Sequence, residues 1–124
     1  MTKYNLISAA FLTVSLTLPM QASAYNGNDL KMDCRHAEQV INEGTISGEL
    51  AATEYTYCQA YIVGAWHGIL VGSGEDAGFC TPKGGITRGQ IVLTITKYLR
   101  DHPEQLHFLA ADLVGAAMIK GFPC

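Results

Sequence analysis

The chain has 124 residues, of which 48% are hydrophobic and 15% charged, and its formal net charge at pH 7 is −3. This length allows one domain with a modest core. The mildly acidic charge, without a run of basic residues, argues against nucleic acid and anionic membrane surfaces as partners.

Residues 1–24 have the pattern of a cleavable export signal. Lys3 precedes an apolar run over 6–18, Pro19 ends that run, and Ala22-Ser23-Ala24 is a small-x-small cleavage pattern. The run is too short for a comfortable transmembrane helix. We therefore expect cleavage after this pattern, release into the periplasm and no membrane contact afterwards. The remaining chain carries seven Lys and Arg against eleven Asp and Glu, a net charge of −4.

The first elements expected after the signal are short. Residues 25–32 are polar and predict a mobile N-terminal tail ahead of a domain over 33–124. A short helix is expected over about 33–42, with Asp33 as its N-cap and Gly44 just past its end. The segment 45–52 fits either a loop or a helical turn.

A helical spacing of apolar residues predicts a longer helix from about Thr53 to Val71. Its apolar stripe consists of Cys58, Tyr61, Ile62, Ala65 and Ile69. On a neighbouring face, small residues recur every four positions at Ala60, Gly64, Gly68 and Gly72. Small residues at this spacing let another helix approach closely. Two interpretations stay open: packing within the domain, or contact between two copies in a homodimer.

Residues 72–85 contain five glycines and a proline, which predicts that no regular helix forms there. A helix is expected to begin at Thr87, which forms a capping box with Gln90, and to run to Arg100. A last helix is expected from Pro103, ending at Gly121. Its buried side is predicted to consist of Leu106, Leu109, Ala110, Leu113, Ala117 and Met118. No segment alternates like a strand, so the predicted fold class is all-α: a small single-domain bundle of about four main helices.

Four cysteines, Cys34, Cys58, Cys80 and Cys124, all lie downstream of the predicted signal. An even number in an exported chain predicts two disulfides, and four cysteines allow three pairings. We favour Cys34–Cys58, which would join the first helix to the second. We also favour Cys80–Cys124, because one helix runs away from Cys80 and the last helix returns to the same end.

No catalytic or metal-binding set is evident in the sequence. The four histidines are His36, His67, His102 and His107, and none forms an H-x-x-x-H pair. Ser73 lies near His67 along the chain, but no G-x-S-x-G elbow accompanies it. We therefore predict neither enzyme activity nor a metal or other cofactor.

The segment Gly72-Ser73-Gly74-Glu75-Asp76 places two carboxylates near the tip of a glycine-rich loop. A slender acidic loop on a rigid helical frame is suited to enter the cleft of another protein. The alternative is an ordinary solvated connection between helices, and the residues alone favour that alternative.

Five short motifs follow one another in the chain: Tyr57-Cys58, Tyr61 to Gly64, Phe79-Cys80-x-Pro82, Tyr98-Leu99-x-x-His102-Pro103-Glu104, and Phe122-Pro123-Cys124. Each is weak alone. In this order and spacing, over about residues 33–124, they resemble the Rap/Tai family of type VI secretion amidase immunity proteins.

The resemblance implies a small helical periplasmic protein, often a homodimer, that inhibits a peptidoglycan amidase effector. It implies that the 72–79 loop enters the active-site cleft of the effector. Glu75 and Asp76 would then pair with a cationic group at the rim of the cleft, and Ser73 would hydrogen-bond inside it. The alternative function is a periplasmic acid-stress chaperone, although a charged content of 15% is low for opening driven by titration.

Overall fold

The computed structural model describes residues 23–124, so the predicted export signal lies outside the described residues except for its last two. In the described part, no strand is present, and the α-helices are α1 (Gly27–Asp33), α2 (Ala37–Glu43), α3 (Glu49–Ser73), α4 (Arg88–Asp101) and α5 (Ala110–Gly121). Two single turns of 3-10 helix, η1 (Gly74–Asp76) and η2 (Pro103–Gln105), follow α3 and α4. The predicted all-α class is confirmed. None of these helices is both long enough and apolar enough to cross a bilayer.

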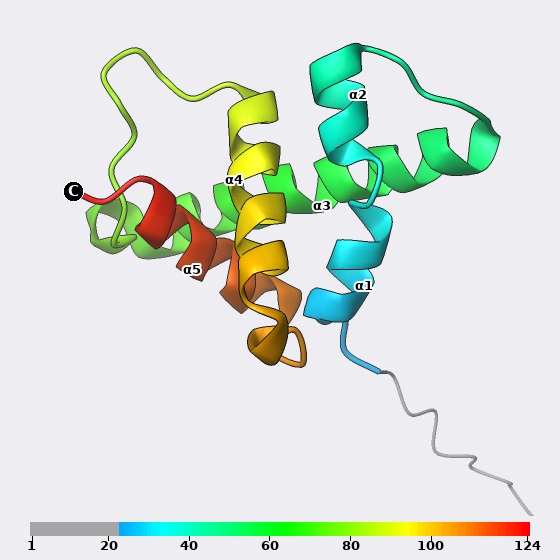
Figure 1. Ribbon diagram of the computed structural model, residues 1–124. Coiled ribbons are helices and arrows are strands. Elements are labelled where there is room, and N and C mark those ends of the chain that lie inside the picture. The colour runs from blue at the N-terminus through cyan, green and yellow to red at the C-terminus, as the bar shows by residue number, and fades with distance from the viewer. Residues whose placement is uncertain (1–22) are drawn as a thin grey trace, which may run out of the picture.

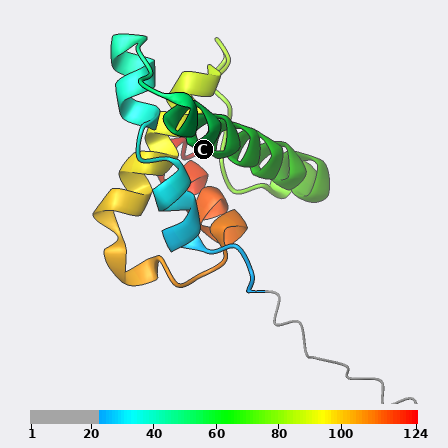
Figure 2. The ribbon, with the colours of Figure 1, turned by 90° about the vertical axis from the view of Figure 1, so that its right-hand side faces the viewer.

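Helix α3 forms one side of the molecule, and the other helices pack against its inner side (Figures 1 and 2). Helix α4 crosses α3 steeply and contacts all four other α-helices, so it occupies the centre of the second layer. The core lies between these layers. Its largest fully buried side chains are Leu30, Cys58, Ile62, Ile91, Val92, Ile95, Leu99, Val114 and Met118.

Most predicted buried positions of the last helix are confirmed, but one is wrong. Leu106, Ala110, Leu113, Ala117 and Met118 are buried. Leu109 is 50% exposed because the helix starts at Ala110 rather than near Pro103, which leaves Leu109 as its extended N-cap residue.

The other predicted helices are present with shifted ends. Helix α3 begins at Glu49, so the ambiguous segment 45–52 is partly helical. At the start of α4 the predicted capping box is confirmed: the N–H of Gln90 donates to Oγ1 of Thr87 at 3.2 Å, and the N–H of Thr87 donates to Oε1 of Gln90 at 2.8 Å. Helix α2 starts after His36 instead of Asp33.

The prediction of a mobile tail over 25–32 is wrong, because these residues enter and form helix α1. Asn26 and Asp29 make a capping box: Oδ1 of Asn26 accepts from the N–H of Asn28 at 2.8 Å, and the Asp29 carboxylate accepts from the N–H of Asn26 at 3.0 Å. Leu30 on this helix is fully buried. The polar composition of residues 25–32 therefore gives no sign of the docked helix, which contributes a single large residue to the core.

Tyr25 fixes the segment that enters α1. Its hydroxyl donates to the Asp33 carboxylate at 2.6 Å, and its ring lies 4.6 Å from that of Tyr61 between centroids. Burial raises the pKa of Tyr25 above its ordinary value, and the hydrogen bond to Asp33 raises it further. The backbone is also paired with the chain before α5, since the N–H of Ala110 donates to the carbonyl of Tyr25 at 3.1 Å.

Both predicted disulfides are confirmed. Cys34–Cys58 joins the end of α1 to α3, and both of these residues are buried. Cys80–Cys124 joins the connection between α3 and α4 to the segment after α5, and both of these residues are exposed. One bridge therefore lies in the core, and the other lies at the surface beside the predicted binding loop.

Candidate functional site

Residues 72–76, called here the acidic turn, form the end of α3 and a single turn of 3-10 helix. Gly72 and Ser73 still belong to α3, so the prediction of no regular helix is wrong for these two residues. The chain changes direction at Gly74, which has φ 56° and ψ −128°, a conformation that glycine adopts far more easily than other residues. The N–H of Gly74 still donates to the carbonyl of Leu70. The acidic turn is thus a continuation of the rigid helix.

The acidic turn carries two exposed carboxylates, Glu75 and Asp76. Within residues 23–124, neither carboxylate lies within 4.0 Å of a Lys, Arg or His nitrogen. Figure 1 shows this turn at the end of α3 that is remote from α2. The turn therefore presents negative charge at one end of the molecule without a cation of its own to offset it.

The chain just after the acidic turn is fixed to α5. Ala77 and Phe79 are buried. Between them, Gly78 has φ 78°, and a Cβ on it would lie 3.3 Å from the side chain of Ile119. The N–H of Cys80 donates to the carbonyl of Phe122 at 2.8 Å, next to the Cys80–Cys124 disulfide. The base of the turn is therefore held by core packing, a hydrogen bond and a covalent bond.

A second projecting element was not singled out from the sequence. Residues 81–86 rise away from the helices as the yellow-green loop in Figure 1. A turn within it is closed by the N–H of Gly85, which donates to the carbonyl of Pro82 at 2.8 Å, and it exposes Lys83. The Pro82-Lys83-Gly84-Gly85 sequence is a turn signal that could have identified it. The acidic turn and this loop lie at opposite ends of the same α3–α4 connection.

The row of small residues on α3 points away from the domain. Ala60, Gly64 and Gly68 are exposed, and a Cβ on either of these glycines would meet no described atom within 4 Å. Packing of this row within the domain, one of the two interpretations, is therefore wrong for the described residues. The same helix exposes Leu50, Tyr57 and Val71 by 69%, 65% and 88%. At about 100° per residue, these three side chains fall on the same face as the small residues.

The remaining candidate side chains do not form a reactive set. Ser73 and His67 are six positions apart on α3, which places them roughly 120° apart around the helix axis. The ring of His67 packs against that of Trp66 with centroids 4.6 Å apart. Within residues 23–124, no group of three or more His, Cys, Asp or Glu side chains is arranged to hold a metal ion.

Comparison with known proteins gives one clear relationship. A family model for Rap1a immunity proteins matches residues 26–124. Comparison with curated proteins and with solved structures gives no match. The family match begins at the N-cap of α1 and includes both disulfides and the acidic turn. It agrees with the resemblance carried by the five sequence motifs. This chain belongs to the family of Rap1a immunity proteins.

Proposed function

We propose that this protein is a periplasmic immunity protein that binds and inhibits a peptidoglycan amidase effector of type VI secretion. The family supports an immunity role through binding of a cognate effector. The observation that carries the choice of site is the acidic turn, which combines exposed, uncompensated carboxylates with a fixed base. In this proposal the turn and the residues up to Phe79 dock at the active-site cleft of the effector.

Inhibition in this proposal is occlusion without turnover. Glu75 and Asp76 pair with a cationic group at the rim of the cleft, and the hydroxyl of Ser73 supplies a hydrogen bond beside them. The rigidity of the turn matters because ordering a free loop on binding costs affinity. Charge pairs that lose their water on binding couple by about 1.5–7 kcal/mol at well-studied interfaces, so two carboxylates are enough to set the register.

Glu75→Arg is expected to weaken binding of the effector by at least about tenfold, because attraction at the rim becomes repulsion. The matched control is Glu43→Arg, which reverses an exposed carboxylate at the end of α2, far from the turn along the chain. Both variants are titrated against the purified effector by calorimetry. Both variants are also expressed in cells that export the effector to their periplasm, and lysis of these cells is measured. Equal protection by the two variants would contradict this use of the turn.

We also propose that the outer face of α3 contacts a second copy of the chain. The domain covers only the inner side of α3, and the outer face exposes large apolar side chains beside the row of small residues, a combination typical of an interaction surface. The small residues would let two α3 helices approach closely, while Tyr57 and Val71 would flank the contact.

Gly64→Arg is expected to convert the dimer to a monomer, since a long cation would stand where the two backbones approach. Gly84→Arg is the control, because a Cβ at Gly84 also meets open space but lies on the 81–86 loop. Light scattering coupled to size-exclusion chromatography measures the molar mass of each. A wild-type mass equal to one copy would refute the dimer.

A further inference from the structure

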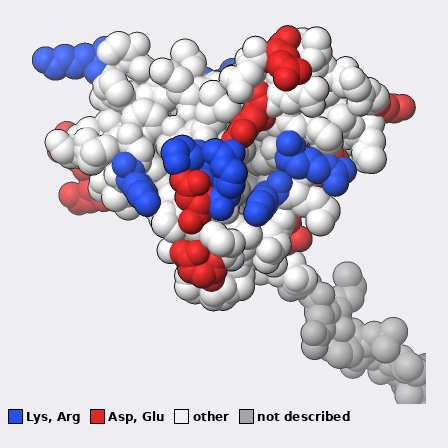
Figure 3. All heavy atoms as spheres, viewed as in Figure 1, with Lys and Arg blue, Asp and Glu red and all other residues white. Residues whose placement is uncertain are grey.

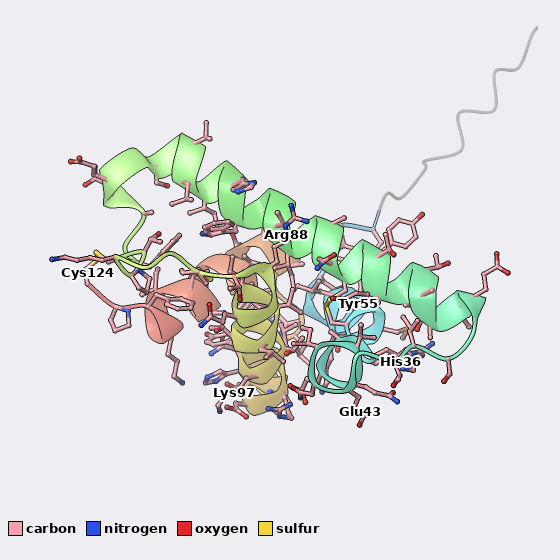
Figure 4. All side chains as sticks on the ribbon, turned by 90° about the horizontal axis from the view of Figure 1, so that it is seen from above. His36, Glu43, Tyr55, Arg88, Lys97 and Cys124 are labelled. Carbon is pink, nitrogen blue, oxygen red and sulfur yellow. A yellow bond between two sulfur atoms is a disulfide. The ribbon has the colours of Figure 1, made fainter. Side chains whose placement is uncertain are left out.

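A groove between α4 and α5 has the features of a binding site, and it is separate from the acidic turn and from the outer face of α3. It measures about 320 Å³ and is lined by Lys97, Tyr98, Asp101, His102, Ala117 and Lys120, among others. The helices come close beside it, since a Cβ on Gly121 would lie 2.5 Å from Cγ2 of Thr94. Figure 4 shows Lys97 on the side of α4 where α5 lies. The Tyr98 ring and the buried Ala117 give the groove apolar surface.

Of the two lysines that line this groove, Lys120 contacts a histidine and a tyrosine ring. The Lys120 ammonium donates to Nε2 of His102 at 2.9 Å and lies 5.8 Å from the centroid of the Tyr98 ring. Because an ammonium group only donates, Nε2 must accept and the His102 proton is on Nδ1, which lies 3.1 Å from the Glu104 carboxylate. Tyr98 is fixed in turn, since its hydroxyl donates to Oε1 of Gln105 at 2.8 Å.

The charges around the groove leave Lys120 without an anion. Asp101 pairs with Lys97, and Arg100 pairs with Glu38 and lies 4.0 Å from Asp101, so both of these cations already have a carboxylate partner. The hydrogen bond from Lys97 lowers the pKa of Asp101, and Arg100 lowers it further. Within residues 23–124, no carboxylate lies within 4.0 Å of the Lys120 ammonium. Figure 3 shows the wider pattern on this face, where Lys and Arg form a band with Asp and Glu among and beside them.

We infer that this groove binds the terminal carboxylate of a short peptide with small side chains. The exposed Lys120 ammonium contacts His102 and the Tyr98 ring, and it is suited to a charge-assisted hydrogen bond with a carboxylate oxygen. The Tyr98 ring and Ala117 provide apolar contact for a methyl-sized side chain next to that carboxylate. The groove is larger than a single inorganic ion needs, which favours a peptide end. This inference does not depend on the proposed inhibition of an amidase.

The test is an NMR titration of the ¹⁵N-labelled protein with three probes: N-acetyl-alanyl-alanine, its C-terminal amide, and inorganic phosphate. The expected result is saturable shifts of the amide signals of Thr94, Lys120 and Gly121 with the peptide acid. The peptide amide should bind about tenfold more weakly or not at all, because it lacks the charge. Equal binding of the amide, or equally tight binding of phosphate at the same residues, would overturn the inference.

Lys120→Gln is expected to weaken binding of the peptide acid by about tenfold or more, since it removes the ammonium and keeps a donor. Lys83→Gln removes one exposed cation on the 81–86 loop and is expected to leave the affinity unchanged. Equal losses in both variants would show a response to overall charge and would also overturn the inference. The spectrum of each variant reports directly whether the fold is kept.

Discussion

Replacement of both Cys80 and Cys124 by alanine is expected to lower the free energy of unfolding by about 4 kcal/mol and to weaken the proposed binding of the effector. The bridge closes a loop with a separation of 44 residues, and the stability figure follows from the chain entropy that such a loop restores to the unfolded state. Small domains are stable by about 5–15 kcal/mol, so this loss is large, but the core helices can still form at low temperature. The expected loss of binding has a different cause, because the base of the acidic turn loses its covalent anchor and keeps only core packing and a hydrogen bond.

The control for this prediction is replacement of Cys34 and Cys58, whose separation is 24 residues. Loop entropy predicts that this replacement lowers the free energy of unfolding by about 3.5 kcal/mol, a value similar to that for the first pair. The Cys34–Cys58 bridge makes no contact with the acidic turn. Urea unfolding gives the stability of each variant, and calorimetry at low temperature, where both are folded, gives the affinity for the effector. If both double variants bind the effector equally well, the surface bridge does not hold the turn in its binding conformation.

Leu30→Ala is expected to lower the free energy of unfolding by about 2–5 kcal/mol, the range for a large apolar side chain removed from a tight core. Leu30 is fully buried, although it belongs to a helix of only seven residues in a polar stretch. A helix this short is not stable alone, so its docking depends on this side chain and on the backbone pairing with the chain before α5.

Met32→Ala is the matched control for Leu30→Ala, because Met32 lies on the same helix but is 61% exposed. It should change the free energy of unfolding by less than about 0.5 kcal/mol. Urea unfolding followed by circular dichroism measures both variants. Equal midpoints for the two variants would mean that residues 25–32 behave as a tail, as their composition suggests.

The sequence predicts those elements whose signals are local. The Thr87–Gln90 capping box marks the start of α4 correctly because all of its atoms belong to four successive residues. Both disulfides follow from the number of cysteines and the direction of the helices. Helix α1 also has a local signal, the Asn26–Asp29 capping box, but its docking depends on contacts with residues about 80 positions away, and the polar composition led to its prediction as a tail.

The candidate site is predicted in position but not in shape. Glu75 and Asp76 are exposed, but they lie on a 3-10 turn that follows α3 directly instead of near the tip of a loop, and Gly72 and Ser73 continue the helix. Glycine has a low helix propensity, but a long, packed helix can tolerate it, and the actual stop at Gly74 depends on a single left-handed residue. The groove at Lys120 could not be predicted, since it depends on how closely α4 and α5 approach.

The pairing of the segment at 25–28 with the chain before α5 has a consequence for how the protein is made. The side chain of Asn28 donates to the carbonyl of Leu106, a partner 78 residues later in the chain. The ribosome therefore releases α1 long before its docking surface exists, and the surface disulfide must wait for Cys124. We expect complete folding of the domain to wait until α5 has been synthesised. Late folding of this kind would suit the proposed export to the periplasm, because an unfolded chain can pass through a narrow translocation channel and fold on the far side.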